Sequence, residues 1–223
     1  MKLRLLRRKK MGHKVNPKAY RIGPVYTWNS RWFANDTQYR KYVREDIVLR
    51  DYLMKQLKTA GIAQIDIERS INKIDITLFV SKPGMAIGRG GTGLELIKKQ
   101  TAQLLKKYRE IGDKLKFEIK IEPIKSMNLN AHLVGTYIAD QLIKRVPHKS
   151  VVNQAMGRVM SSGARGIKVL VGGRINGAEI ARRERFQQGT VPLSTIREKI
   201  DFASTPALTK SGYIGVKVWI CTT

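Results

Sequence analysis

Residues 81–93 read Ser-Lys-Pro-Gly-Met-Ala-Ile-Gly-Arg-Gly-Gly-Thr-Gly, and this glycine-rich stretch decides between two folds. Gly88 to Gly91 fit GxxG, a loop that clamps a nucleic-acid backbone because glycine lets phosphates come close to the main chain. Gly88, Gly90 and Gly93 also fit GxGxxG, the dinucleotide-binding pattern. The chain has 19 glycines and four GxxG matches, so neither pattern is specific on its own.

The residues before the loop separate the two interpretations. A dinucleotide-binding loop follows a core strand directly, inside a parallel βαβ unit. Here Pro83 and Gly84 interrupt the strand predicted at 74–80, and only the short run 85–87 is left before the loop. A loop that joins two helices after paired strands is instead typical of a KH domain, which we favour. A P-loop is excluded because no Gly-Lys-Ser or Gly-Lys-Thr follows.

The alternative from another class is a nicotinamide-dependent enzyme. It would use Gly88, Gly90 and Gly93 as its dinucleotide-binding loop, with Glu110 or Asp113 as the acid that binds the ribose. This alternative leaves the large positive charge of the chain unexplained.

Hydrophobic periodicity on both sides of the loop predicts an α+β chain. The spacing predicts helices and strands in two groups, first a helix over 45–60, strands over 63–68 and 74–80, a helix over 94–108 and a strand over 116–121, and then helices over 129–142 and 152–160 and strands over 167–171, 178–186, 194–202 and 214–220. We expect helices on a three-stranded mixed sheet, followed by two helices packed on a four-stranded antiparallel sheet. The predicted division is a basic extension or mis-assigned start at 1–10, an aromatic-rich basic arm at 11–44, a KH domain at 45–125 and a C-terminal domain at 126–223.

The charge is large and uneven. The 223 residues include 43 Lys and Arg against 17 Asp and Glu, a net charge of +26. Residues 1–35 carry ten basic and no acidic residues, and residues 123–178 carry eight basic residues and only Asp140. Such one-sided stretches predict contact with a polyanion, and nucleic acid is favoured over an anionic membrane surface.

The arm also gathers seven of the sixteen aromatic residues, namely Tyr20, Tyr26, Trp28, Trp32, Phe33, Tyr39 and Tyr42. Aromatic rings among cations can stack on unpaired bases. We favour the other interpretation for most of them, that they anchor an irregular arm on the domain that follows.

Several classes of site are not expected. Cys221 is the single cysteine, which excludes a disulfide framework, and the three histidines lack metal-ligand spacing. No apolar run approaches the length of a membrane span, and the basic start at 1–10 lacks the apolar core of a secretory signal. We therefore expect no cofactor, no metal, no catalytic residues and no membrane association.

The sequence resembles bacterial-type small-subunit ribosomal protein S-three. The N-terminal similarity lies in Met11-Gly12-His13-Lys14-Val15-Asn16-Pro17, Trp28-Asn29-Ser30 and Trp32-Phe33-Ala34. The C-terminal similarity is more specific and lies in Gly173-Arg174, Gly177-Ala178-Glu179-Ile180-Ala181-Arg182, Val191-Pro192-Leu193 and Ile214-Gly215-Val216-Lys217-Val218-Trp219. These blocks occur in the family's order from Met11 to about Ile220.

The resemblance implies a type II KH domain, an S-three-specific C-terminal domain and a place in the head of the small ribosomal subunit. It implies binding to small-subunit ribosomal RNA and mRNA, contact with ribosomal proteins S-ten and S-fourteen, and proximity to S-two, S-four and S-five along the channel through which mRNA enters. It implies a protein that is neither an enzyme nor a homo-oligomer. The expected location is the cytoplasmic ribosome, with an organellar ribosome as the less favoured alternative.

The sequence and the resemblance together give the predicted site. The residues predicted to bind RNA are Gly88, Arg89, Gly90 and Gly91 in the loop, Lys14, Lys18, Arg21 and Arg31 in the arm, and Arg165, Lys168 and Arg174 in the C-terminal domain. The residues predicted to face mRNA are Lys144, Arg145, Lys149 and Arg158.

The chain departs from the family in four places. The family normally begins at the residue matching Met11, many relatives have a longer C-terminal tail, and the loop position at Gly90 is often basic in relatives. The fourth departure concerns the basic cluster that relatives direct at mRNA, which here falls on Lys149, Ser150, Asn153 and Gln154. Since only Lys149 is basic, we expect a contribution to mRNA unwinding that is weakened, or moved to Lys144, Arg145 and the basic arm.

Overall fold

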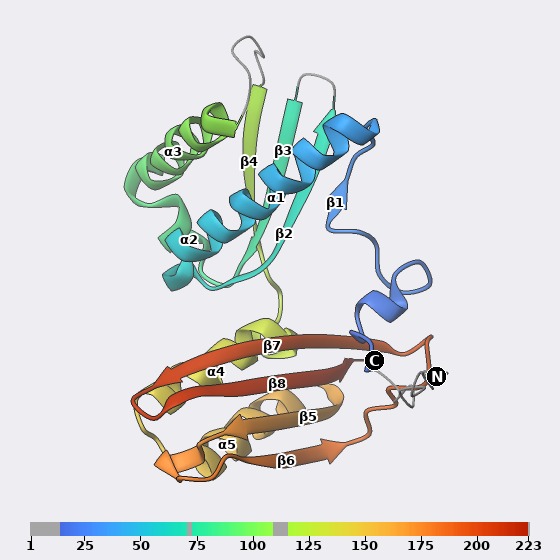
Figure 1. Cartoon of the computed structure of the whole chain (residues 1–223), viewed down its shortest axis with the longest axis vertical. Helices are drawn as coiled ribbons and strands as arrows, with labels where there is room; N and C mark the ends of the chain where they lie inside the picture. Colours follow the sequence, from blue (N-terminus) through green and yellow to red (C-terminus); the bar gives the residue numbers. More distant parts are fainter. Residues whose placement is uncertain (1–13, 71–72, 109–115, 223) are drawn as a thin grey trace, which may run out of the picture.

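The computed structural model describes residues 14–70, 73–108 and 116–222, which form two α+β domains (Figure 1). In the first domain, β1 (Ser30–Arg31) is followed by α1 (Asp36–Gln56), β2 (Ile62–Ser70), β3 (Lys73–Val80), α2 (Pro83–Ile87), α3 (Thr92–Tyr108) and β4 (Lys116–Pro123). The sheet order is β1-β2-β3-β4, with β1 parallel to β2, β2 antiparallel to β3, and β3 parallel to β4. The predicted mixed sheet is therefore confirmed.

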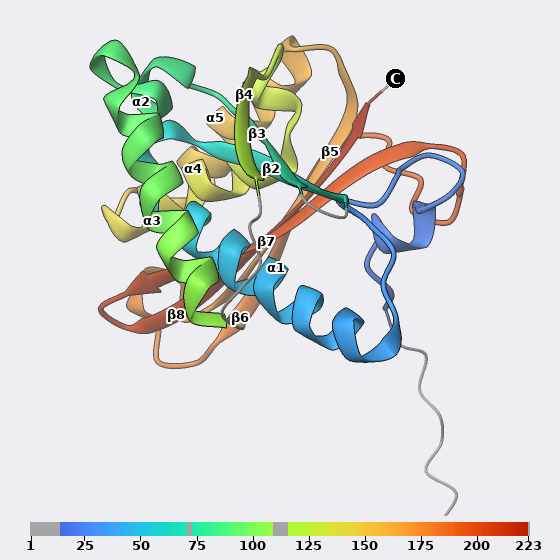
Figure 2. The same ribbon diagram turned by 90° about the horizontal axis from the view of Figure 1, so that it is seen from above.

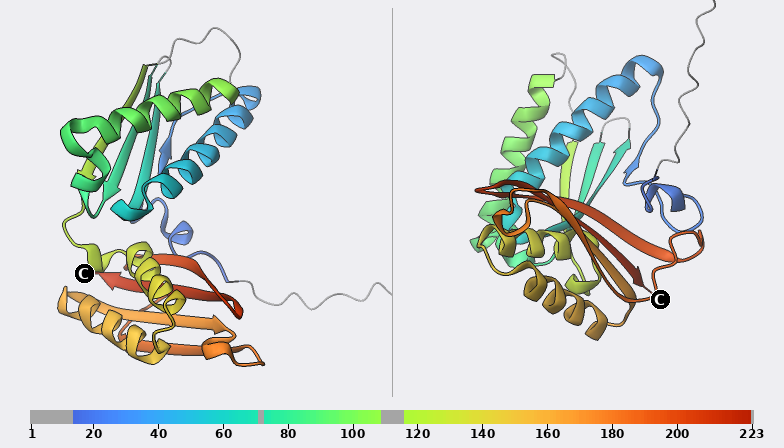
Figure 3. Two further views of the ribbon diagram at one scale, coloured as in Figure 1. Left: turned by 90° about the vertical axis from the view of Figure 1, so that its left-hand side faces the viewer. Right: turned by 60° about the horizontal axis from the view of Figure 1, so that its bottom comes forward.

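Helices α1 and α3 pack side by side over this sheet (Figure 3). Their apolar side chains meet alternate residues of the strands in one core that contains Leu49, Leu53, Ile67, Ile76 and Leu105. The buried positions of β3 alternate strictly, as expected for a strand with one covered face.

The sheet has one more strand than predicted, because the arm adds β1. The Arg50 guanidinium holds this segment by donating to the Asn29 carbonyl oxygen at 3.0 Å and to Ser30 Oγ at 2.7 Å. The Ile67 amide donates to the same Asn29 oxygen at 2.8 Å. Helix α1 also begins at Asp36 rather than near residue 45. Its first turns pack on Trp32, whose ring centroid lies 5.2 Å from that of Tyr39 and 5.5 Å from that of Tyr42.

The second domain places two helices on an antiparallel sheet, as predicted. Its elements are α4 (Ala131–Ile143), α5 (His148–Ser161), β5 (Ala164–Gly173), β6 (Arg182–Gly189), β7 (Lys199–Thr209) and β8 (Gly212–Thr222). The sheet order is β6-β5-β8-β7, and every neighbouring pair is antiparallel. Both helices cover one face of the sheet, with α4 on β7 and β8 and α5 on β5.

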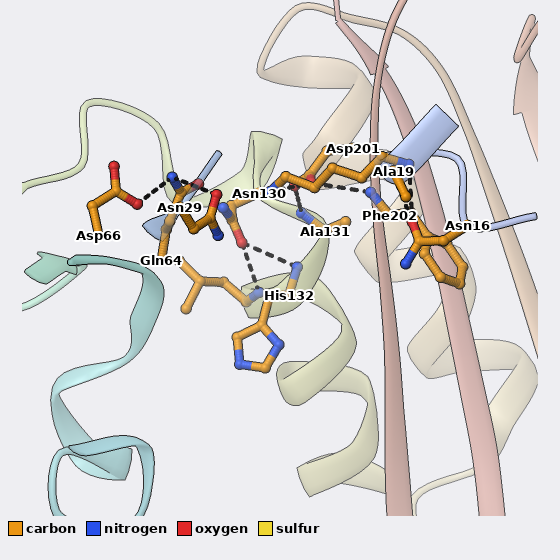
Figure 4. Close-up of polar contacts among 12 residues, drawn as sticks. Asn16, Ala19, Asn29, Gln64, Asp66, Asn130, Ala131, His132, Asp201 and Phe202 are labelled. Atoms are coloured by element: carbon orange, nitrogen blue, oxygen red, sulfur yellow. Dashed lines mark hydrogen bonds and ion pairs between the residues drawn. The ribbon is translucent and has the colours of Figure 1, made fainter. Parts of the chain in front are cut away.

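The start of α4 is fixed by two side chains (Figure 4). Asn130 Oδ1 accepts from the amides of His132 and Leu133, which caps the helix. Asp201 Oδ2, on β7, accepts from the Ala131 amide at 2.8 Å. A carboxylate at a helix N-terminus also interacts favourably with the helix dipole, so α4 is tied to the edge of its sheet.

Two strands of the second sheet are displaced from their predicted positions. β7 begins at Lys199 and runs to Thr209, whereas the alternation predicted a strand at 194–202. Pro206 lies within β7 without breaking it because β7 is an edge strand. β6 begins at Arg182 rather than at residue 178.

The arm contacts both domains (Figure 2). Residues 29–31 pair with β2, whereas the preceding residues pack at the end of the second sheet, where Lys18 Nζ lies 3.5 Å from Asp201 Oδ1. The predicted anchoring on the following domain is thus correct for Trp32, and the arm has a second anchor that was not predicted. Within the described residues, no helix is long and apolar enough to cross a membrane.

Candidate nucleic-acid interface

The glycine loop lies between two helices. α2 ends at Ile87, α3 begins at Thr92, and Gly88, Gly90 and Gly91 all have positive φ, at +74°, +62° and +82°. A Cβ on Gly88 would lie 3.0 Å from the Gly93 nitrogen, so both conformation and space require glycine there. The loop therefore has the helix–GxxG–helix arrangement of a KH domain.

The same geometry excludes the dinucleotide interpretation. Helix α2 separates β3 from the loop, so Gly88 does not follow a strand as a dinucleotide fingerprint requires. The hypothesis of a nicotinamide-dependent enzyme is therefore wrong. Glu110 and Asp113, its two candidate acids, lie outside the described residues.

Arg89 is exposed at the tip of the loop, where its charge is available to a phosphate. Thr92 Oγ1 donates to the Arg89 carbonyl oxygen at 2.9 Å and closes the turn into α3. Three apolar side chains surround the loop, with Met85 56%, Ile87 38% and Leu96 57% exposed. The loop thus presents one cation, a main chain without side chains at its glycines, and a rim of exposed apolar side chains.

Of the four arm cations, Arg21 is not available to RNA, and its predicted role in binding is wrong. Its side chain is fully buried, and its guanidinium donates to backbone oxygens of Glu198 at 2.8 Å, Pro17 at 3.0 Å, Leu193 at 3.0 Å and Thr195 at 2.8 Å, and of Pro192 at 3.4 Å. The guanidinium fork matches a concave ring of carbonyl groups, as its fixed donor geometry allows. Arg21 is a structural tie between the arm and the C-terminal domain.

The other arm cations differ in how accessible their charge is to a phosphate. Lys14 is exposed, and Lys18 is half-buried between Asp201 and the Tyr26 ring, whose centroid lies 5.4 Å from its Nζ. Arg31 is exposed but forms a 2.6 Å ion pair with Glu68. Lys14 is therefore the arm cation best placed to meet a phosphate.

The three candidate cations of the C-terminal domain lie apart from one another in the structure. Arg165 pairs with Glu198 at 2.6 Å, at the end of the sheet where Arg21 is buried. Arg174 follows β5 and donates through Nε to the Ala178 carbonyl oxygen at 2.8 Å, and it stays exposed. Lys168 lies in the middle of β5, on the face of the sheet opposite the helices.

The residues predicted to face mRNA lie around the start of α5. Lys144 and Arg145 form the turn after α4, with Arg145 at φ +62°, and Lys149 follows in the first turn of α5. All three are exposed. Arg158, two turns later, lies with its guanidinium carbon 4.9 Å from the centroid of the Tyr137 ring.

The centre of the exposed α5 face is neutral. Ser150, Asn153 and Gly157 are all exposed, and a Cβ built on Gly157 meets nothing within 4 Å. Below them, His148 is buried at the start of the helix and forms a 2.7 Å contact with Glu184 of β6. The helix is therefore fixed to the sheet while its outer face is open.

Sequence reasoning missed three cations that share a surface with Lys168, namely Arg183, Arg185 and Lys217. The signal was available in the alternation of β6 and β8, where Arg183 and Arg185 flank Glu184, and Lys217 lies between Val216 and Val218. Among the described residues, no group of three or more potential metal ligands occurs.

Comparison with known proteins agrees with this architecture. A family model described as "Ribosomal protein S3, C-terminal domain" matches residues 138–220, and one described as "KH domain" matches residues 48–127. The chain is 44% identical over 210 residues to the small ribosomal subunit protein uS3 of Caldicellulosiruptor bescii, which covers 94% of this chain and 91% of that protein. The proteins of the same name from Streptococcus mutans and Bacillus anthracis are 43% and 44% identical over 94% of this chain, covering 93% and 92% of their own lengths.

Proposed function

The chain belongs to the ribosomal protein S3 family, whose members are structural, RNA-binding constituents of the small ribosomal subunit and not enzymes, and from this we propose a division of labour among its surfaces. The KH loop, the arm and the C-terminal domain bind small-subunit ribosomal RNA in the subunit head. The start of α5 lines the channel through which mRNA enters. The chain works in the cytoplasmic ribosome.

The observation that carries the ribosomal RNA contact is the loop itself. Arg89 is exposed at a turn whose glycines leave the main chain open to a phosphate, at the start of a helix of 17 residues. Phosphate contacts contribute a salt-dependent term to affinity, so each contact can be counted from the salt slope.

The test is the salt dependence of binding to purified small-subunit ribosomal RNA. Arg89→Ala is expected to lower the slope of log K against log salt by about one. Lys55→Ala, at an exposed position of α1, is the matched control and keeps the slope. An unchanged slope for Arg89→Ala would contradict RNA contact at the loop.

For mRNA, we propose that the position beside the channel is kept while strand separation is weakened. Lys149 and Arg158 lie at the two edges of the exposed α5 face, and Ser150 and Asn153 between them are neutral. Lys144 and Arg145, both exposed in the turn before α5, supply the remaining charge near this path, whereas the described part of the arm packs at the opposite end of the sheet, beside Asp201 and Glu198.

The corresponding test restores the missing charge. In ribosomes that carry Ser150→Arg with Asn153→Lys, translation through a stable mRNA hairpin is expected to speed up. The control, Gln38→Arg with Gln56→Lys, adds the same charge at exposed positions of α1. Equal hairpin read-through in all three ribosomes would refute the proposal.

The proposed protein neighbours follow from the family resemblance. They are S-ten and S-fourteen in direct contact and S-two, S-four and S-five nearby, with no second copy of the chain. Cross-linking mass spectrometry on purified small subunits tests this arrangement, and cross-links to other ribosomal proteins alone would contradict it.

A further inference from the structure

The sheet of the C-terminal domain has a face that its helices leave uncovered, and the arm covers only the end of it at Ile200 and Cys221. Helices α4 and α5 pack on one side, against the buried residues Ile167, Val169, Val216 and Val218. In Figure 1 both helices lie behind the sheet, and the opposite face is directed at the viewer. The strand register shows which residues lie on this face. They form three rows, each with one residue from β6, β5, β8 and β7 in that order. The rows are Gln187-Lys168-Trp219-Phe202, Arg185-Leu170-Lys217-Ser204 and Arg183-Gly172-Gly215-Pro206. We call these three rows the open sheet face.

The open sheet face carries four cations and no carboxylate. Arg183, Arg185, Lys168 and Lys217 form no ion pair with any carboxylate of the described residues. Arg183, Arg185 and Lys217 are exposed. Burial lowers the pKa of Lys168, and the nearby charges of Arg185 and Lys14 lower it further, so these cations repel one another. Such a cluster costs folding energy unless an anion neutralises it.

The face also offers flat and aromatic surfaces. Trp219 and Phe202 stand next to each other with ring centroids 5.1 Å apart, and Lys168 Nζ lies 5.1 Å from the centroid of the Trp219 ring. Gly172 and Gly215 are paired in the third row. A Cβ built on Gly215 would have the Gly172 carbonyl oxygen as its nearest atom, at 3.8 Å. Two facing glycines leave the main chain accessible to a partner that lies flat on the sheet.

We propose that the open sheet face is an RNA-binding surface, on which the cations hold the sugar–phosphate backbone and the Trp219–Phe202 pair supports a ribose or base. The proposal deepens the function proposed above and rests on it, since it assigns a further contact to the same ligand. Charge decides the partner, because four unpaired cations without a carboxylate fit a polyanion, whereas a protein surface of mixed charge would leave most of them unpaired. Aromatic side chains on a sheet beside cations are a recurrent platform for RNA.

The first experiment counts phosphate contacts. Arg185→Ala with Lys217→Ala is expected to lower the salt slope of binding to small-subunit ribosomal RNA by about 1.4 to 1.8, since each phosphate contact contributes about 0.7 for single strands and 0.9 for duplex. The control, Lys55→Ala with Lys120→Ala, removes the same charge from exposed positions of the first domain. All four side chains are exposed, so circular dichroism should report an unchanged fold for both variants.

An unchanged slope in the Arg185/Lys217 variant, with the parent chain still binding RNA, overturns this inference alone. If the parent chain itself shows no salt-dependent binding to this RNA, the proposed function is overturned as well. Equal losses in the test and control variants would show a net-charge effect and would also overturn the inference.

The second experiment identifies the partner in the assembled particle. A photoreactive amino acid at position 217, in small subunits that contain the full chain, is expected to form adducts with ribosomal RNA. The same group at position 55 is the control for non-specific labelling. Adducts with proteins alone would overturn the proposal and assign the open sheet face to a protein neighbour.

Discussion

Replacing Arg21 tests whether the arm is held to the C-terminal domain by one buried guanidinium. In Arg21→Ala, four carbonyl oxygens that accept at 2.8 to 3.0 Å lose their donor at once. If water enters and satisfies two of them, the other two cost about 1–3 kcal/mol each, a loss of about 2–6 kcal/mol. Since every 1.4 kcal/mol is tenfold, local opening is expected to become about 30-fold more frequent or more.

Hydrogen exchange measures this opening better than global unfolding, because a two-domain chain is not expected to unfold in one step. The amides to follow are those of Tyr20, Gly23 and Val25, which donate to backbone oxygens within the arm. Their exchange should accelerate in Arg21→Ala while the amides of β3 keep their protection. Arg21→Lys should be nearly as damaging, because an ammonium group lacks the planar fork that reaches all four oxygens.

The matched control is Arg31→Ala, which removes an exposed arginine from the same arm. Its ion pair with Glu68 is at the surface, and such pairs contribute about 0–1 kcal/mol. Equal exchange rates in Arg21→Ala and the parent chain would refute the argument that these carbonyl oxygens depend on the guanidinium. Full rescue by Arg21→Lys would show that charge alone suffices.

Four further substitutions should change stability in directions that follow from the structure. Asp46→Asn removes the buried carboxylate that accepts from Arg69 and from Trp32 Nε1 at 2.9 Å. It should destabilise the first domain by about 3 kcal/mol, measured by hydrogen exchange of the amides of β2 and β3. Gly88→Ala forces a non-glycine residue to φ +74° and ψ 177° and should destabilise the first domain by about 1–3 kcal/mol. Gly157→Ala, in a helix with open space, should stabilise the second domain by up to about 1 kcal/mol, and hydrogen exchange of each domain's own amides measures both changes. Burial lowers the pKa of His132 in the folded chain. Below pH about 6.5 the unfolded chain therefore takes up a proton that the folded chain resists. The free energy of unfolding should be unaffected by His132 above pH about 6.5 and should fall below it. A His132→Gln variant should lose part of this slope between pH 7 and 5, and an identical pH profile would contradict the assignment.

The KH loop was predictable because everything that defines it is local. Pro83 and Gly84 end the strand, the glycines at 88, 90 and 91 require positive φ, and the apolar spacing of α3 starts directly afterwards. Each of these signals is read within about ten residues, and the structure places the loop where they indicate.

The start of α1 and the position of β7 were predicted wrongly, for different reasons. Tyr39, Tyr42 and Val43 do recur at helical spacing before Ile47, but the prediction assigned these aromatic residues to an irregular arm, whereas in the structure they belong to α1 and pack on Trp32. The alternation predicts a strand at 194–202, yet the carbonyl oxygens of Thr195 and Glu198 accept from Arg21 instead of from a neighbouring strand. At the start of this segment a contact from the arm therefore overrides local preference.

The same long-range contact explains why charge counting misassigned Arg21. From the sequence, Arg21 is one more cation in a stretch without acids, equivalent to Lys14 and Arg31. In the structure its hydrogen bonds span more than 170 positions along the chain, which no local pattern reports. By contrast, Arg183, Arg185 and Lys217 were overlooked because they lie in a stretch of nearly balanced charge, although strand alternation separates them from Glu184.

The arm contacts both domains and so affects RNA binding by fixing their relative position as well as by its charge. One peptide contributes β1 to the first sheet and the buried Arg21 to the second domain, so it fixes how the KH loop and the open sheet face lie relative to each other. Two RNA contacts on one rigid body bind more tightly than the same contacts on independently moving domains, since less freedom is lost on binding. Arg21→Ala is therefore expected to weaken binding to small-subunit ribosomal RNA while leaving its salt slope unchanged, because no phosphate contact is removed. A reduced slope in that variant would contradict this argument, because it would show that a phosphate contact is lost together with the guanidinium.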